Sequence, residues 1–369
     1  MTTHDKYAFP EGTESWGIPL AGESRFTWEY DDGREKLLAL YQKGKDKQWD
    51  AVKRIDWSLP FDRTDPLQLP PETLPIFGSK THQKIKDDEV EMGRLALHLA
   101  SWQFSQFLHG EQGAMICSAR ITESVPDLDA KFYAATQVMD EARHAETYAR
   151  LLQEKLGLVY PINPHLKILL DQTLSDRRWD MPYLGMQVLI EGVALAAFGL
   201  LRDMTQVALP KQILAYVMQD EARHVAFGRL ALRDYYAQLS SAELAEREEF
   251  VVEGCYLLRD RFKAEEVWRT LGYDVEDCAY TVDHSPFMQL YRSLLFTRIV
   301  PCVKDIGLWG PKVQKAYTDL GVTHMASTDL AALMKSDEDL AERIDEEKRL
   351  AIRQGKVEIA EVIHIGAEG

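Results

Sequence analysis

The chain has 369 residues, of which 46% are hydrophobic and 28% charged, a composition typical of a globular protein with a large buried core. Its 43 Lys and Arg residues against 59 Asp and Glu residues give a formal net charge of −16. A chain this acidic lacks the basic surface that binds a phosphate backbone. We therefore expect no nucleic-acid partner.

The cysteines and the N-terminal residues indicate a cytoplasmic protein without a membrane span. The four cysteines are Cys117, Cys255, Cys278 and Cys302. They form no Cys-x-x-Cys pair, and the first residues lack the apolar run of a signal peptide. The most apolar stretch, residues 181–201, carries Glu191 in its middle, so no uncharged apolar run reaches the roughly 18 residues that a transmembrane helix needs.

The first half of the chain predicts an N-terminal extension followed by two long helices. Residues 1–82 are rich in proline and aromatic side chains, and we expect them to pack on the core as an extension. Apolar residues then recur at helical spacing over residues 87–124. A second helix is expected over residues 127–156, because Gly157 occupies a C-cap position and Pro161 follows it.

Two further long helices follow, separated from the first pair by a connector that contains a short helix near residues 165–174. Pro182 opens the third long helix, which stops before Pro210, and the fourth runs from there to about residue 239. The helices pair as two hairpins with short turns. The sequence therefore predicts an all-α protein built on a four-helix bundle over residues 83–240.

The remaining residues predict additional helices and a short tail. Ser240 and Glu243 form the sequence signature of a capped helix start, and helical patterns alternate with Gly and Pro up to residue 355. We expect residues 241–355 to form helices that flank the bundle. Residues 356–369 alternate in polarity, a pattern compatible with a strand, a partner-binding tail or a fraying end.

One pentapeptide, Asp-Glu-Ala-Arg-His, occurs twice, at Asp140–His144 and at Asp220–His224. Each copy contains Glu-x-x-His, and residues three apart lie on one face of a helix. Glu111 and Glu191 each stand 30 residues before the Glu of a motif. A lone Glu on two helices and a Glu-x-x-His on two others is the ligand set of a carboxylate-bridged dinuclear centre. The predicted metal ligands are Glu111, Glu141, His144, Glu191, Glu221 and His224.

A structural interpretation of these residues has to be weighed against the metal site. A single Glu-x-x-His is common on solvated helix faces, but two identical copies with equally spaced partners favour a site. Glu191 is the sole charged residue between Leu184 and Leu201, and an unpartnered buried carboxylate would be costly. Four carboxylates neutralise two divalent cations, and oxygen ligands combined with imidazole favour iron or manganese.

Four other residues of the two pentapeptides are expected to support the ligands. Asp140 and Asp220 each lie four residues before a ligand His and can accept its second imidazole N–H, directly or across the helix pair. Arg143 and Arg223 stand beside the histidines and can pair with these aspartates.

The order Glu, Glu-x-x-His, Glu, Glu-x-x-His over residues 87–239 resembles the ferritin-like di-iron carboxylate superfamily. Asp-Glu-x-Arg-His in both halves is similar to the hydroxylase subunits of bacterial multicomponent monooxygenases. The resemblance implies a ferritin-like bundle in which Glu111, Glu141 and His144 hold one iron, and Glu191, Glu221 and His224 complete the second. The Thr that those hydroxylases carry one turn after the third-helix Glu is Leu195 here. Val217 stands where arylamine N-oxygenases carry a third His, which disfavours that activity.

These features predict a di-iron oxygenase that reduces dioxygen and hydroxylates, desaturates or otherwise oxidises a small organic substrate. Manganese, or a mixed manganese and iron pair, is the alternative cofactor. Small residues near the lone glutamates suggest space at the metals or close helix packing. They are Gly113, Ala114, Gly192, Ala194, Ala196, Ala197 and Gly199.

Two other functions remain open at this point. Tyr148 lies four residues after His144, the spacing of the radical tyrosine in the small subunit of ribonucleotide reductase, although a core-packed Tyr with a hydrogen-bonded hydroxyl is the simpler interpretation. A ferroxidase or iron-storage protein is the other alternative, and the length of the chain counts against it. The sequence contains no Gly-x-Gly-x-x-Gly motif or cysteine cluster, so we expect a separate reductase or ferredoxin as electron donor. We also expect a homodimer.

Overall fold

The computed structural model describes residues 16–20, 22–30 and 33–353. Within these residues the chain forms helices and no β-strand, which confirms the all-α prediction. The α-helices are α1 (Glu35–Asp46), α2 (Ala51–Arg54), α3 (Lys80–Ile85), α4 (Glu89–Ser124), α5 (Leu128–Arg150), α6 (Pro164–Ser175), α7 (Asp180–Pro182), α8 (Glu191–Met204), α9 (Ala208–Tyr236), α10 (Ser241–Asp260), α11 (Glu265–Leu271), α12 (Val275–His284), α13 (Pro286–Leu294), α14 (Ile299–Asp305), α15 (Pro311–Asp319) and α16 (Leu330–Arg353). The tail over residues 356–369, for which the sequence leaves a strand, a partner-binding tail and a fraying end open, lies outside the described residues.

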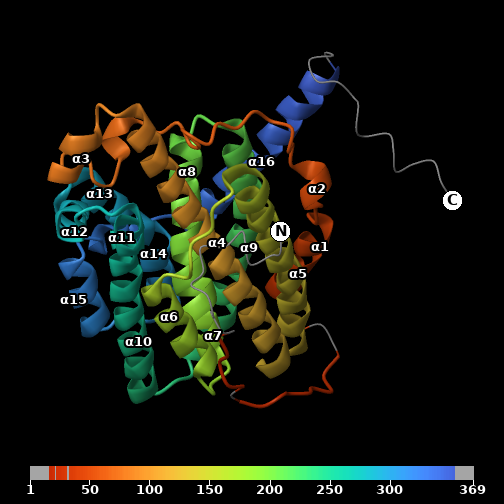
Figure 1. The fold of residues 1–369 in the computed structure, drawn as a ribbon. Helices are drawn as coiled ribbons and strands as arrows, with labels where there is room; N and C mark the ends of the chain where they lie inside the picture. The colour runs from red at the N-terminus through yellow and green to blue at the C-terminus, as the bar shows by residue number, and fades with distance from the viewer. Residues whose placement is uncertain (1–15, 21, 31–32, 354–369) are drawn as a thin grey trace.

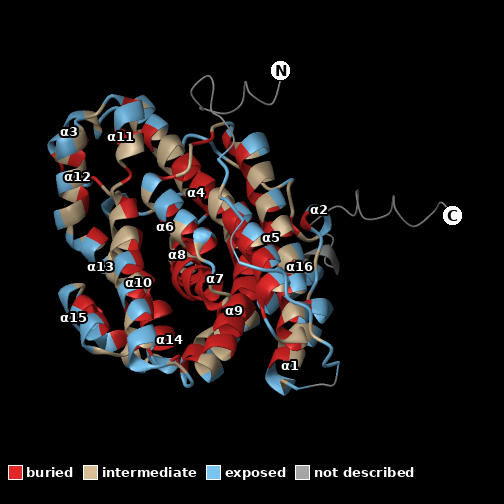
Figure 2. Ribbon diagram, turned by 90° about the horizontal axis from the view of Figure 1, so that it is seen from below, coloured by how far each residue is buried: buried red, intermediate tan, exposed pale blue. Residues whose placement is uncertain are grey.

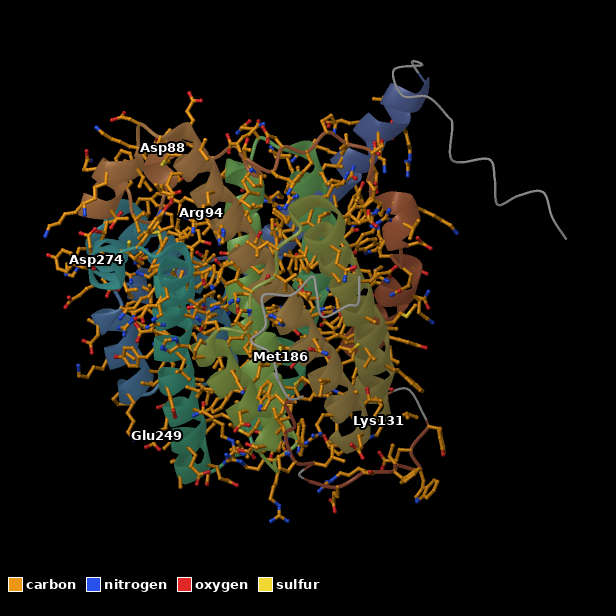
Figure 3. The ribbon with its side chains drawn as sticks, viewed as in Figure 1. Asp88, Arg94, Lys131, Met186, Glu249 and Asp274 are labelled. Carbon is orange, nitrogen blue, oxygen red and sulfur yellow. The ribbon has the colours of Figure 1, made fainter. Side chains whose placement is uncertain are left out.

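Four long helices, α4, α5, α8 and α9, form a bundle at the centre of the molecule (Figure 1). Helices α4 and α5 form one hairpin, and α8 and α9 form the other. Asp88, which caps the start of α4, and Lys131, in the first turn of α5, lie at opposite ends of the molecule, as an antiparallel hairpin requires (Figure 3). The predicted four-helix bundle with flanking helices is therefore confirmed.

Side-chain caps explain where α4 and α5 begin. The carboxylate of Asp88 accepts hydrogen bonds from two backbone N–H groups at the start of α4, and Asp127 does the same for one N–H of α5. Pro182 and Pro210 do not open their helices as predicted. Each lies at the third position of a helical segment that begins two residues earlier. Proline is tolerated there because it lacks a backbone N–H, and the N–H groups of the first turn have no acceptor within the helix.

The third bundle helix contains a π-helical turn that no pattern in the sequence predicts. Residues Tyr183–Ile190 are π-helical and connect α7 to α8 without a break, so that the α-helix resumes at Glu191. The continuous helix Asp180–Met204 is long and apolar enough to cross a membrane, but 83% of its most apolar window is buried inside the protein. Figure 2 shows the centre of the bundle as buried. Burial on all sides accounts for the apolar composition of this helix.

The remaining helices cover the bundle on two sides (Figure 1). Helix α1 packs against α5 and α9, and α16 packs against α9. Arg54 in α2 forms an ion pair of 2.8 Å with Asp345 in α16, which joins the N-terminal part of the chain to its last helix. Helices α10 to α15 lie together on the opposite side of the molecule. The division of the chain at residues 82, 240 and 355 stays a prediction.

Candidate metal centre

All six predicted ligands meet in the interior of the four-helix bundle. The carboxylate–histidine cluster consists of Glu111 from α4, Glu141 and His144 from α5, Glu191 from α8, and Glu221 and His224 from α9. Each of the six residues exposes 5% of its surface or less. The 3.6-residue repeat of the helices directs the Glu and His of each pentapeptide to the same side.

The six side chains are arranged as two overlapping groups. One group contains Glu111, Glu141, His144 and Glu221, and the other contains Glu141, Glu191 and His224, with ligand atoms inside each group within 4.8 Å of one another. Nδ1 of His144 lies 3.1 Å from Oε1 of Glu221, and Nδ1 of His224 lies 3.1 Å from Oε1 of Glu141. The implied assignment of three ligands to each half is therefore too simple. Glu141 and Glu221 each approach the histidine of the other motif, as bridging ligands would.

Five atoms of the cluster that could bind a metal are buried without hydrogen-bond partners among the described residues. These atoms are Oε2 of Glu141, Nδ1 of His144, Oε2 of Glu191, Oε1 of Glu221 and Nδ1 of His224. Buried polar atoms are nearly always paired, so a group of unpaired atoms that face one another indicates a missing partner. A pair of cations satisfies carboxylate oxygens and imidazole nitrogens together. The cluster thus has the donor set, burial and spacing of a dinuclear metal site.

The electrostatics of the cluster also fit cations. Burial raises the pKa values of Glu111 and Glu191 well above the usual range, and the charge of Glu221 adds to the effect. The pKa of Glu141 is lowered, because the neighbouring imidazoles outweigh the effect of burial. Burial lowers the pKa values of His144 and His224, but the surrounding carboxylates raise both of them overall. Metal bound to these carboxylates and imidazoles would replace their protons.

The two pentapeptides support each other's histidines across the bundle. Nε2 of His144 lies 3.0 Å from Oδ2 of Asp220, and Nε2 of His224 lies 3.2 Å from Oδ2 of Asp140. An ionised carboxylate can only accept, so each imidazole donates from Nε2 and leaves Nδ1 for a metal. The aspartates were predicted to accept from the histidines either directly or across the helix pair, and the structure shows the second arrangement.

Both arginines of the pentapeptides contact these aspartates, as predicted. Arg143 donates to Asp140 at 2.6 Å and to Asp220 at 2.8 Å, and Arg223 also donates to Asp220. Burial raises the pKa of Asp220, but the charge of Arg223 and the hydrogen bond from His144 outweigh burial and hold the pKa well below its usual value. The aspartate therefore stays ionised and keeps accepting from the imidazole.

Three polar residues that were not predicted from the sequence extend this network. Nε1 of Trp49 donates to Oδ2 of Asp220 at 2.7 Å, and Nε2 of Gln48 donates to Oδ1 of Asp140 at 2.7 Å. Both come from the segment after α1, and nothing in the sequence places that segment beside α5 and α9. Gln137 donates to Glu141 at 2.9 Å and to Glu191 at 2.8 Å. Its position four residues before Glu141 was a usable signal, because that spacing places both on one helix face.

Tyr148 lies inside an aromatic cluster rather than in a hydrogen-bonded position. Its ring centroid is 5.6 Å from that of Phe107 and 6.0 Å from that of Phe198. The prediction of a core-packed Tyr is confirmed, but the prediction of a hydrogen-bonded hydroxyl is wrong, because no described residue pairs with it. Burial raises the pKa of Tyr148 well above its usual value, and the charge of Glu111 contributes.

A small cavity of about 20 Å³ adjoins the cluster and is lined by three of its carboxylates, those of Glu111, Glu191 and Glu221. Met186, which lies near the middle of the molecule in Figure 3, also lines it. Of the small residues noted in the sequence, all but Ala196 fall into two groups. Ala114, Ala194 and Ala197 line the cavity, as a pocket requires. The glycines pack instead, since a Cβ added at Gly113, Gly192 or Gly199 would meet Leu170, Ile299 or Met218.

Comparison with known proteins finds only distant similarity. No family model matches the chain, and no curated protein matches it significantly. Among solved structures, a variant of an R2-like ligand-binding oxidase with an anaerobically reconstituted Mn/Fe cofactor is 16% identical, with 74% of this chain and 94% of that chain covered and a TM-score of 0.45. A Synechococcus protein with aldehyde deformylating oxidase activity is 17% identical, with 60% and 94% covered and a TM-score of 0.43. The interpretation of the site depends on its own geometry.

We predict that the protein binds two metal ions per chain after anaerobic reconstitution with ferrous iron. Glu191→Ala should lower the metal content to one ion or fewer, because it removes a ligand from the group that contains His224. Elemental analysis of the desalted protein measures this. The matched control is Glu249→Ala, which removes an equally charged side chain from the surface, where Glu249 is 62% exposed (Figure 3). Fewer than one ion in the unmodified protein, or unchanged binding in Glu191→Ala, would contradict the assignment.

We also predict that Asp140→Ala and Asp220→Ala each lower metal affinity by about 10- to 100-fold, because the imidazoles lose the acceptor that orients them. Competition with a chelator measures the affinity, and circular dichroism checks that the helices remain. Asp234→Ala is the matched control on α9, because that carboxylate is 62% exposed. If both variants keep the affinity of the unmodified protein, the aspartates have no positioning role.

Proposed function

We propose that this chain is a di-iron oxygenase that reduces dioxygen at the carboxylate–histidine cluster and oxidises a small organic substrate. Manganese, or a mixed manganese and iron pair, is the alternative cofactor. The observation that supports the proposal is the position of the cavity. Its wall includes Glu111, Glu191 and Glu221, so a molecule inside it would lie directly against the ligands. A purely structural metal site would need no such space.

When bound, iron would supply the electrons that reduce dioxygen. The chain itself provides a dry and fixed environment for this chemistry. Gln137 holds the carboxylates of Glu141 and Glu191 through the two N–H groups of one amide, so their orientation is coupled. Asp140 and Asp220 fix the imidazole rings in the same way. Phe107 and Phe198, whose rings are 4.5 Å apart, close the apolar side of the cavity and exclude water.

Electrons would have to arrive from a separate reductase or ferredoxin, and Trp49 offers a route from the surface. Its indole donates to Asp220, and the same oxygen of Asp220 accepts from His144. Trp49 is only partly buried and lines a surface groove next to α16. A continuous hydrogen-bonded path therefore runs from the groove to a ligand of the cluster.

We predict that the iron-loaded, reduced protein consumes dioxygen, and that Ala197→Leu impairs substrate oxidation more than dioxygen consumption. The added side chain would fill a cavity of about 20 Å³ without removing a ligand. An oxygen electrode measures consumption, and mass spectrometry measures the products from a panel of small organic compounds. Ala196→Leu is the matched control, because Ala196 is also buried on α8 but does not line the cavity.

Two outcomes would replace the oxygenase with another function. A stable tyrosyl radical that disappears in Tyr148→Phe would indicate a radical-generating subunit similar to that of ribonucleotide reductase. Dioxygen consumption that only accumulates a ferric mineral would indicate a ferroxidase or storage protein. Absence of any reaction between dioxygen and the reduced, iron-loaded protein would contradict all three.

We predict that Trp49→Phe slows reduction of the metals by a protein electron donor several-fold, because it removes the indole N–H that contacts Asp220. Stopped-flow spectroscopy with a reduced ferredoxin measures the rate. Trp57→Phe is the matched control, since the Trp57 indole donates to the backbone oxygen of Ala51 instead. Equal rates in Trp49→Phe and the unmodified protein would exclude the route.

A further inference from the structure

Arg261 is a buried cation whose guanidinium lies 5.2 Å from the centre of the Phe262 ring but forms no ion pair with a described residue. It lies in the 3₁₀ turn Arg261–Lys263 that follows α10, and 6% of its surface is exposed. Its Nε has no hydrogen-bond partner, and the charge of Glu266 acts on the guanidinium without forming an ion pair with it. Burial lowers the pKa of Arg261 to about 10, so the side chain remains positively charged at neutral pH. An unpaired buried charge is costly, which indicates a function other than stability.

The other buried arginines of the described chain all have partners. Arg143 and Arg223 pair with the aspartates of the pentapeptides, Arg247 pairs with Asp180, Arg202 and Arg298 share Asp337, and Arg120 donates to the backbone oxygen of Leu174. Glu266 on α11 forms no ion pair with Arg261. Its Oε1 already accepts hydrogen bonds of 2.8 Å from Trp102 and Asn163. This fold therefore neutralises its buried arginines in general, and Arg261 is an exception.

Arg261 lines the same cavity as the carboxylates of the cluster. It forms no ion pair with these carboxylates, which belong to Glu111 on α4, Glu191 on α8 and Glu221 on α9. Apart from Gln106, the rest of the wall is apolar and includes Phe107, Leu166, Met186, Ile190, Val193 and Phe262. The cavity thus offers one cation, an apolar wall and the metal ligands. That combination suits an amphipathic molecule with one negative group.

We propose that Arg261 binds the carboxylate of an organic acid whose apolar part lies in this cavity beside the cluster. The substrate of the proposed oxygenase is then an apolar monocarboxylic acid, a conclusion that rests on the proposed function. Binding of such an acid to Arg261 does not depend on that function. A guanidinium donates two parallel hydrogen bonds to a carboxylate, and burial strengthens them. A molecule of this kind would supply the counter-charge that the protein does not.

Binding requires the cavity to widen, because about 20 Å³ holds only a molecule the size of water. The wall contains flexible side chains, including Met186, that can change rotamer. Gly110 also lines the cavity, and a Cβ added there would meet no atom within 4 Å. The open space beside Gly110 could accommodate the displaced side chains or part of the acid.

The direct test is calorimetric titration of the metal-loaded protein, without oxygen, with hexanoate, 1-hexanol and hexylamine. We expect hexanoate to bind most tightly. Arg261→Met should weaken hexanoate binding by about 10- to 100-fold, which is the value of a charge-assisted hydrogen bond, and leave hexanol binding unchanged. Arg261→Lys should retain part of the preference. Arg259→Gln is the matched control, because it removes a positive charge two residues away that is paired with Asp260.

The outcomes separate this inference from its alternatives. Equal affinity of hexanoate and hexanol, or unchanged hexanoate binding in Arg261→Met, would overturn it. The second result would mean that the metals themselves bind the carboxylate. Failure of every acid from acetate to decanoate, and of benzoate, to bind would also overturn it. Because no turnover is involved, acid binding without substrate oxidation would leave this inference intact and count against the oxygenase.

Thermal stability provides a second readout that a structural role would not share. Arg261→Met should unfold at the same or a higher temperature than the unmodified protein, because it removes a buried charge that has no ion pair. Arg247→Met, which breaks the buried pair with Asp180, should unfold at a lower temperature. A large drop in the unfolding temperature of Arg261→Met would show that Arg261 stabilises the fold, and would overturn the proposal.

Discussion

Four carboxylates buried at the centre of a helical bundle are the constraint on which the rest of this structure depends. Burial raises the pKa of two of them, Glu111 and Glu191, and repulsion from the other carboxylates adds to the effect. The surrounding residues respond in alternating layers of charge. Two imidazoles face the carboxylates, two aspartates face the imidazoles, and two arginines face the aspartates. The negative charge of the four carboxylates in the innermost layer is not fully balanced by neighbouring side chains, and a pair of cations would balance it.

The position of the cluster depends on how closely the helices approach one another. Gly228 on α9 lies against Gln187, and an added Cβ would come within 2.5 Å of the Gln187 side chain. Gly185 and Gly254 make similar close contacts with Thr173 and Leu189. Such contacts hold α9, α10 and the π-helical turn at short distances. The alanines around the cavity then leave a space that larger side chains would fill.

The ligands could be predicted from the sequence because they follow from helical periodicity alone. Glu141 and His144 are three residues apart, and a lone Glu in an apolar helix such as Glu191 needs a partner. Support from outside the bundle could not be predicted in this way. Trp49 and Gln48 reach the cluster only because α1 packs on α5 and α9, a tertiary contact that no local pattern records. The π-helical turn before Glu191 could not be predicted either, because its residues are equally compatible with an α-helix.

The crossed support of the histidines gives a physical reason for the two pentapeptides to be identical. Each Asp serves the His of the other copy, so a change in one copy disturbs the metal ligand of the other half. Glu141 and Glu221 are also within reach of both histidines. The first ion to bind would therefore order the donors of the second, and loading would be cooperative. Protein with only one ion bound would be a minor species. A substitution in one pentapeptide would therefore affect metal binding by both.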